Sequence, residues 1–321
     1  MEQKMIDQEL QQQMRKVYIN TLIELAKKDE KIIVLDADLM IANGTKPFYE
    51  KFPNRAFDIG AAESNMAGIA AGLSTLGKIP FASTFACFAS RRLYDQFFLS
   101  CNYAQLNVKM TGTDPGITAT SNGGTHMAFE DLALMRVIPG ITIIEPADNI
   151  SLRALLPQIA YDVKCAYIRI DRKAIPIIYE SDEQFELGKA NIIHDGEDIT
   201  IIASGIIMVP EAIKAAKLLN DHGISAAVLD MHTIKPLDSE TVLNYAAKTG
   251  MIITCENHQI NGGLGSAVAE VLSEKLPTPL RRIGVKEQFG QVGDIEYLKE
   301  YYGMTAEHIQ ETCIEMLKMK K

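Results

Sequence analysis

The chain has 321 residues, a length that predicts two domains, since single domains commonly contain about 150 residues. Its composition, with 47% hydrophobic and 23% charged residues, is typical of a folded globular protein and excludes a disordered, collagen-like or coiled-coil chain. The formal charge of -9 argues against a nucleic-acid-binding surface, because such a surface needs clustered Lys and Arg.

The cysteines and the amino-terminal segment favour a protein of the cytoplasm. The five cysteines are far apart and contain no C-x-x-C pair, so the sequence predicts neither a disulfide framework nor a zinc site. The segment MEQKMIDQELQQQMRK is polar, whereas a signal peptide needs an apolar region, and no apolar stretch reaches the length of a membrane span. We therefore expect a soluble cytoplasmic protein.

Short apolar runs alternate with segments of helical periodicity. An amphipathic helix is expected within residues 6–28. After it, strands are predicted at 32–37, 57–60, 79–84, 108–112, 141–146 and 166–171, and helices from Ser64, near 86–104, near 128–136 and at 149–161. Such alternation is typical of an α/β domain with a mostly parallel sheet.

An acidic segment without a helical stripe, residues 176–191, is the expected connection between domains, with a boundary near residue 185. Beyond it the alternation returns. Strands are predicted at 198–205, 224–231, 251–256 and near Leu280, and helices from Pro210, Asp238 and Gly265. The predicted fold is therefore two doubly wound α/β domains with mostly parallel sheets, a larger one over 10–180 and a smaller one over 186–321.

The segment DIGAAESNMAGIAAGL (58–73) contains a strand end followed at once by a helix start. Glu63 lies at this junction, where open α/β sheets bind their ligands. Its carboxylate has two interpretations. It is either a solvated group that complements the helix dipole, or a group held among apolar residues that exchanges a proton with a nitrogen base.

Four other residues have an ordinary structural interpretation. Phe85 and Phe88 lie three apart, a spacing that is typical of ordinary core aromatics. His126 ends the Gly-rich loop SNGGTH and is either a turn residue or part of an active-site loop. Asp38 fits a turn or a helix cap equally well.

One apparent nucleotide-binding motif is rejected. The segment NGGLGSAV (261–268) imitates the dinucleotide pattern G-x-G-x-x-G, but Val268 stands where the last glycine belongs. A single partial match of this kind does not indicate a dinucleotide site.

Segments along most of the chain resemble the carboxy-terminal half of transketolases. They are DADLMIAN (36–43), ESNMAGIAAGL (63–73), FASTFACFASRRLYDQ (81–96), SNGGTHMAFEDLALMRVIPGITIIEPAD (121–148) and IDRKAIP (170–176), with further similarity through CENHQINGGLGSAVAEVL. Deoxyxylulose phosphate synthases and the beta subunits of 2-oxo acid dehydrogenases share the same two modules. The resemblance implies a first domain that binds the aminopyrimidine ring of thiamine diphosphate and a second, transketolase-type C-terminal domain.

The resemblance also implies roles for individual residues. Glu63 matches the catalytic glutamate that hydrogen-bonds a nitrogen of the cofactor's pyrimidine ring. Phe85 and Phe88 match the phenylalanines that stack on that ring. His126 matches a catalytic residue that contacts substrate oxygens and transfers protons, and Asn122 lies in the same substrate-binding loop.

Two further residues, Asp38 and Arg172, also match positions of the family. Asp38 matches an aspartate near the cofactor and the subunit interface. Arg172 matches an arginine that holds the phosphate of a sugar phosphate, with Arg169 as the competing choice.

The chain departs from the transketolase pattern at four positions. The family often has an acid at the position of Asn122, a histidine near that of Asp114, a serine at that of Ala42 and an aromatic residue at that of Arg91. The preferred sugar is therefore not predicted by the sequence.

The family's G-D-G motif, which holds the cofactor's diphosphate and Mg2+ in a separate amino-terminal module, does not occur in the sequence. The resemblance thus implies a partner subunit that supplies the Mg2+ ligands, in a heterotetramer with two copies of each chain. We also expect two copies of this chain to pair through the helix that starts at Glu63, whose Ala67, Ala70 and Ala71 permit close packing.

The predicted function is that of the C-terminal subunit of a split transketolase, which transfers a two-carbon ketol unit between ketose and aldose phosphates. The alternatives are a subunit like deoxyxylulose phosphate synthase, one like a 2-oxo acid dehydrogenase beta chain, and a noncatalytic assembly subunit of the same fold. The combination of Glu63, Phe85, Phe88 and His126 favours an enzyme.

Overall fold

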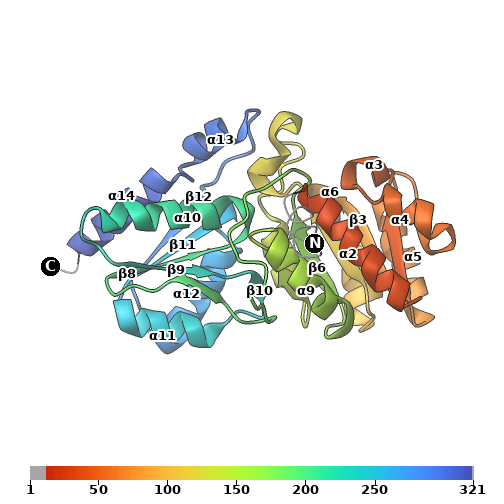
Figure 1. Cartoon of the computed structure of the whole chain (residues 1–321), viewed down its shortest axis with the longest axis horizontal. Helices are drawn as coiled ribbons and strands as arrows, with labels where there is room; N and C mark the ends of the chain where they lie inside the picture. The colour runs from red at the N-terminus through yellow and green to blue at the C-terminus, as the bar shows by residue number, and fades with distance from the viewer. Residues whose placement is uncertain (1–11, 320–321) are drawn as a thin grey trace.

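A computed structural model describes residues 12–319, and two β-sheets organise this part of the chain (Figure 1). The strands of the first sheet are β1 (Ile32–Asp36), β2 (Ala56–Asp58), β3 (Ile79–Phe85), β4 (Lys109–Thr113), β5 (Thr142–Ile144), β6 (Ala166–Ile170) and β10 (Thr233–Lys235). Their order is β10-β5-β6-β4-β3-β1-β2, and every neighbouring pair is parallel except β10 with β5.

The second sheet is smaller. Its strands are β7 (Asn191–His194), β8 (Ile199–Ala203), β9 (Ala226–Asp230), β11 (Ile252–Gln259) and β12 (Leu280–Val285), in the order β12-β11-β8-β9-β7. Only the edge strand β7 is antiparallel to its neighbour. The predicted fold class, two α/β units with mostly parallel sheets, is confirmed.

Helices cover the first sheet on two faces. One face packs against α2 (Met14–Lys28) and α9 (Asn149–Tyr161), and the other against α5 (Glu63–Thr75), α8 (Asp131–Arg136) and the π-helix η2 (Phe97–Tyr103). Side chains of β1 alternate between these two cores: Ile33 and Leu35 enter one, and Ile32 and Val34 enter the other. Burial on both faces is the reason that the strands read as continuous apolar runs in the sequence.

The second sheet is covered in the same way. Figure 1 shows α10 (Gly205–Asn220) and α14 (Ala306–Lys318) on one side of it and α11 (Ser239–Thr249) and α12 (Leu264–Lys275) on the other. The helix α13 (Ile295–Tyr302) precedes α14. Within residues 12–319, no helix is both long enough and apolar enough to cross a lipid bilayer.

Three predicted elements differ in extent from those observed. The helix expected within 6–28 begins at Met14, and residues 6–11 of that prediction lie outside the described residues. The helix expected near 86–104 is divided into α6 (Ala86–Arg91), α7 (Tyr94–Gln96) and η2. The helix expected from Pro210 begins earlier, at Gly205. Local periodicity marks these segments but does not define where the backbone bends.

The strand β10 links the two halves of the chain and was not predicted. It follows the predicted boundary near residue 185, yet it pairs with β5 of the first sheet. The backbone N–H of Glu145 donates to the carbonyl of His232 at 2.9 Å, and the Lys235 ammonium donates to the carbonyls of Arg136 and Ile138 at 2.7 and 2.6 Å. The first sheet is therefore completed by residues of the second half.

Asp148 joins the start of α9 to the connection that follows β6. One carboxylate oxygen accepts hydrogen bonds from the backbone N–H groups of Ile150 and Ser151, and the other accepts from those of Ile178 and Tyr179. Asp148→Ala is expected to lower the free energy of unfolding by about 2–4 kcal/mol, because it removes a helix cap and leaves further N–H groups without a partner.

A helix cap that lies at the protein surface provides the control for this variant. Asp294 caps α13 through a hydrogen bond from the Tyr297 N–H, and its side chain is exposed. Asp294→Ala should therefore cost only about 1 kcal/mol. Urea unfolding of both variants tests the difference, and equal losses would show that Asp148 does no more than cap α9.

Candidate active site

The carboxyl ends of three adjacent strands lie together and define the candidate site. Phe85 ends β3, Asp114 directly follows β4, and Arg172 follows β6 by two residues. The registers pair β3 with β4 and β4 with β6, so these ends share one edge of the sheet. This edge is where open parallel sheets bind ligands.

His126 packs against the two phenylalanines. Its ring centroid lies 6.0 Å from that of Phe85 and 5.4 Å from that of Phe88, both in an edge-to-face arrangement. The Phe85 and Phe88 centroids are 6.0 Å apart. His126 Nδ1 lies 2.8 Å from the Thr125 hydroxyl, and Nε2 has no hydrogen-bond partner within residues 12–319. The structure thus brings together two half-buried aromatic rings and one imidazole nitrogen that is available to a ligand.

Arg172 extends this cluster. Its guanidinium lies 4.7 Å from the Phe85 ring centroid and donates from Nε to Asp114 Oδ2 at 2.6 Å. Asp114 is only 3% exposed and has a left-handed backbone with φ +53°. Its other oxygen, Oδ1, is buried and has no partner among the described residues. Burial and, secondarily, the charge of Asp114 raise the pKa of the neighbouring Asp171 to about 6.

Glu63 is the first residue of α5, where an acid complements the helix dipole, and is 8% exposed, so most of its side chain is held among other residues. Within residues 12–319 its carboxylate has no hydrogen bond or ion pair. The next residue, Ser64, donates to the carbonyl of Arg92 at 2.7 Å, and the Arg92 guanidinium lies 5.7 Å from the Phe88 ring centroid. The start of α5 therefore contacts the residue that follows α6, the helix that carries Phe88. The Glu63 carboxylate is not among the fully buried polar atoms that lack a partner in the described residues, so it is open to a ligand.

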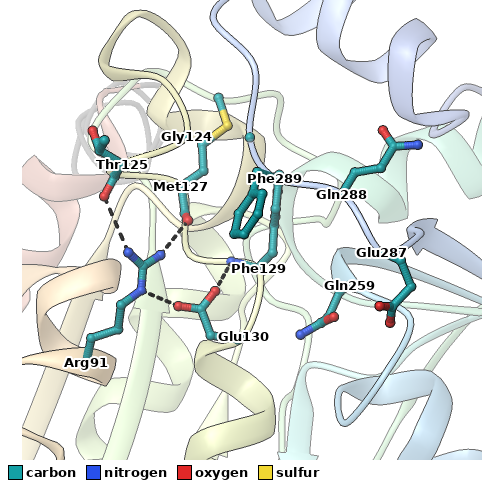
Figure 2. Close-up of a pocket in the computed structure, with 11 residues that line it drawn as sticks. Arg91, Gly124, Thr125, Met127, Phe129, Glu130, Gln259, Glu287, Gln288 and Phe289 are labelled. Atoms are coloured by element: carbon teal, nitrogen blue, oxygen red, sulfur yellow. Dashed lines mark hydrogen bonds and ion pairs between the residues drawn. The ribbon is translucent and has the colours of Figure 1, made fainter.

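A cavity of about 920 Å³ between the two halves of the chain borders the loop that carries His126 (Figure 2). Arg91 forms an ion pair with Glu130 in this cavity and donates to the carbonyl of Met127 at 2.9 Å. Phe289, which comes from the second half, also lines this cavity and is drawn beside Met127 and Phe129 in Figure 2; it is 94% exposed. Arg91 thus braces the loop around residues 125–130.

Asp38 lies apart from this cluster. It has a left-handed backbone, an exposed side chain, and an amide that donates to Asp58 at 2.8 Å. Together with Arg15, Ala42 and Asp58 it lines a separate cavity of about 370 Å³. Sequence reasoning missed Arg15, whose guanidinium donates to the Ala42 carbonyl at 2.6 Å. The helix was expected within residues 6–28, so the sequence did not place this arginine in the first turn of a helix that begins at Met14.

Asn122, the remaining predicted substrate residue, lies in the same loop as His126. Its side chain is exposed and forms no hydrogen bond to the described part of the chain. The structure therefore leaves this amide accessible but does not join it to the aromatic cluster.

Arg169, the competing anion-binding choice, is fully buried. Its guanidinium forms ion pairs with Asp131 at 2.9 Å and Glu145 at 2.5 Å. It is therefore a structural residue, whereas Arg172 is only half-buried at this sheet edge. His232 and His258, whose roles the sequence leaves open, are also buried, and burial lowers the pKa of each to about 4.

The expected pairing surface on α5 is not available. Ala67, Ala70 and Ala71 are buried in the core of their own chain, beneath the first sheet. The prediction that these alanines face a second copy is therefore wrong. Helical periodicity identifies a small-residue face, but that face packs against β3 and η2.

Comparison with known proteins identifies both halves of the chain. Residues 11–177 match the family model for the transketolase pyrimidine-binding domain, and residues 188–309 match that for the transketolase C-terminal domain. The 6-deoxy-6-sulfo-D-fructose transketolase subunit SqwH of Clostridium sp. (strain MSTE9) is 52% identical over 96% of this chain and 95% of its own length. An apulose-4-phosphate transketolase subunit of Phocaeicola vulgatus is 38% identical over 95% of this chain and 97% of its own.

A solved structure of a split-gene transketolase, described as an inactive beta4 tetramer, superposes on this chain with a TM-score of 0.88. It is 43% identical and the match covers 96% of this chain and 99% of that one. These relatives span the same two domains over nearly their whole lengths. The chain therefore belongs to the transketolase family, as a subunit that carries the pyrimidine-binding and C-terminal domains of a split enzyme.

Proposed function

We propose that this chain, with a partner subunit, uses thiamine diphosphate to transfer a two-carbon ketol unit from a ketose to an aldose. The observation that carries the proposal is Glu63, which is 8% exposed and whose carboxylate has no partner in the described part of the chain. The helix that it starts contacts the end of α6, which carries Phe88 of the Phe85, Phe88 and His126 cluster. An acceptor without a protein partner can take a hydrogen bond from a ligand.

The residues present fit the pyrimidine end of the cofactor. Phe85 and Phe88 offer aromatic surface without competing for ring nitrogens. Glu63 offers an acceptor that shares a proton with a ring nitrogen. When bound, thiamine diphosphate supplies the carbon nucleophile and stabilises the negative charge that develops on the substrate.

The chain's own residues then have distinct tasks. Glu63 holds a proton at the pyrimidine ring, and the two phenylalanines orient that ring. His126 moves a proton to or from a substrate oxygen through its unpartnered Nε2. Arg172 holds the anionic end of the sugar through the N–H groups that Asp114 leaves free, and Asn122 contacts the substrate from the loop of His126. Asp38, which lies apart from the aromatic cluster, would contact the cofactor away from its pyrimidine ring.

The partner subunit would hold the diphosphate and Mg2+. Within residues 12–319, no three His, Cys, Asp or Glu side chains are grouped to hold a metal ion. The names of the relatives support a split enzyme, since two are called subunits and the solved relative is an inactive tetramer of one chain type. We infer a complex with two copies of each subunit.

The sugar substrates would each end in an anion. The relatives' names refer to 6-deoxy-6-sulfo-D-fructose and apulose-4-phosphate, which carry a sulfonate and a phosphate. Both groups offer oxygens that a guanidinium can bind. Arg172 is our candidate for this contact, since its guanidinium lies 4.7 Å from the Phe85 ring centroid at this sheet edge.

Co-purification with the amino-terminal subunit tests the proposal. The complex, with thiamine diphosphate and Mg2+, should convert a ketose and an aldose phosphate into the products of two-carbon exchange. This chain alone, and the complex without cofactor, should be inactive. A stable, cofactor-loaded complex that exchanges no two-carbon unit on any phosphate or sulfonate sugar would overturn it in favour of the noncatalytic alternative.

Truncation of an aromatic ring should weaken cofactor binding. We expect Phe88→Ala to raise the Kd of the complex for thiamine diphosphate about 10–100-fold, because the ring's stacking and buried apolar area are lost. Tyr161→Ala, at the exposed end of α9, is the matched control. Calorimetric titration measures both Kd values. An unchanged Kd for Phe88→Ala would show that this ring does not bind the cofactor.

A further inference from the structure

The charge of Arg172 is already balanced within the chain. Asp114 accepts from Nε of its guanidinium and forms an ion pair with Nη2. Only Nη1 has no partner within residues 12–319. Because Asp114 is 3% exposed, its negative charge is held in place beside the guanidinium and is weakly screened by water.

The residues that adjoin Arg172 in the chain do not restore a positive charge. Asp171 is buried, and Lys173 donates to the Thr118 carbonyl and the Thr120 hydroxyl at 3.4 and 3.1 Å. Asp114 and Asp171 thus supply two acidic groups, and Arg172 and Lys173 supply two basic groups, so the charges of these four residues balance. Of the cations elsewhere around this edge, Arg91 is paired with Glu130, and Arg15 shares its cavity with Asp38 and Asp58. Arg92, 5.7 Å from the Phe88 ring centroid, is exposed and forms no ion pair within residues 12–319, so its charge is screened by water.

The common anionic ends of sugars differ in charge. A phosphate monoester carries about -1.5 to -2 charges at pH 7, because its second pKa is about 6. A sulfonate carries a single negative charge at the same pH. Both present three acceptor oxygens, so hydrogen-bonding capacity does not separate them and charge does.

We infer that Asp114 determines substrate specificity by neutralising Arg172, so that the site accepts a singly charged group such as a sulfonate in preference to a phosphate dianion. The inference rests on the proposed function and deepens it, since it concerns the end of the sugar that Arg172 binds. It also explains a departure from the family, where a histidine, which can carry positive charge, is common near this position.

The experiment compares two ketoses that differ at one end. The purified complex with its partner subunit, thiamine diphosphate and Mg2+ is assayed with fructose 6-phosphate and with 6-deoxy-6-sulfofructose. We expect a higher kcat/KM for the sulfonate in the unmodified enzyme. Asp114→Asn and Asp114→His should each raise the phosphate-to-sulfonate ratio of kcat/KM by about tenfold or more, mainly through KM.

Controls separate specificity from positioning. Asp221→Asn, an exposed substitution in the second half of the chain, should leave the ratio unchanged. If Asp114 only positions Arg172, both ketoses will lose activity equally in the variants and the ratio will stay constant, which overturns the inference. A preference of the unmodified enzyme for phosphate would overturn it as well.

The two proposals fail in different ways. If the complex turns over neither ketose, the proposed reaction fails. Calorimetric titration of the same complex with each sugar then tests the inference directly, because it measures the two affinities without turnover. A sulfonate preference that falls in the Asp114 variants supports it, and equal affinities throughout contradict it.

Discussion

Glu63→Gln is expected to reduce kcat of the assembled enzyme by about 10²–10⁴-fold, the usual contribution of a positioned proton donor or acceptor. Glutamine matches glutamate in shape but cannot share a proton with the pyrimidine ring as a carboxylate does. The fold should change little, because the Glu63 carboxylate has no hydrogen bond or ion pair among the described residues. The loss should be limited to the interaction of a first-turn acid with the helix dipole, about 0.3–1 kcal/mol, so the unfolding midpoint should move little.

This combination distinguishes a catalytic role from a structural one. A structural residue would lose stability and activity together, whereas Glu63→Gln should lose activity alone. Steady-state rates and urea unfolding of the same preparation measure both quantities. Glu311→Gln, an exposed substitution on α14, is the control and should change neither. A Glu63→Gln enzyme with nearly normal kcat would refute the proposed mechanism.

The sequence was sufficient to predict the layers of the fold and the junction between strand and helix at which Glu63 lies. Buried parallel strands read as apolar runs, and helices read as stripes of period 3.6, so their alternation is a local signal. The cluster of Phe85, Phe88 and His126 followed from the resemblance to transketolases rather than from periodicity. The structure brings those three rings together although the histidine is 38 residues beyond Phe88 in the chain.

Contacts between distant segments could not be predicted in the same way. The strand β10 is three residues long and pairs across the predicted domain boundary, so it has no periodicity to detect. Arg169 and Arg172 are three apart and chemically identical, and only the tertiary structure shows that one is fully buried and the other only half-buried. The ion pair of Asp114 with Arg172 joins the ends of two strands for the same reason.

Arg169 holds the two sheets together at their buried junction. Besides its ion pairs with Asp131 and Glu145, its Nη2 donates to the carbonyl of Asn257 in the second half at 2.8 Å. Glu145 in turn accepts from the hydroxyl of Ser204, also in the second half, at 2.7 Å. Burial alone would lower the pKa of Arg169, but the two carboxylates outweigh it and raise the pKa, so the guanidinium stays charged.

Arg169→Met is therefore expected to lower the free energy of unfolding by about 3–5 kcal/mol, because it leaves the carboxylates of Asp131 and Glu145 buried without a counter-charge. Addition of Asp131→Asn and Glu145→Gln removes those charges and should restore much of the loss. Arg153→Met provides the control, since Arg153 is half-buried and its ion pair with Glu24 is 3.7 Å long. The urea concentration at the unfolding midpoint is measured for Arg169→Met, for the triple variant and for Arg153→Met. If Arg169→Met is as stable as the control, or if the triple variant is less stable than Arg169→Met alone, buried charge does not hold this junction together.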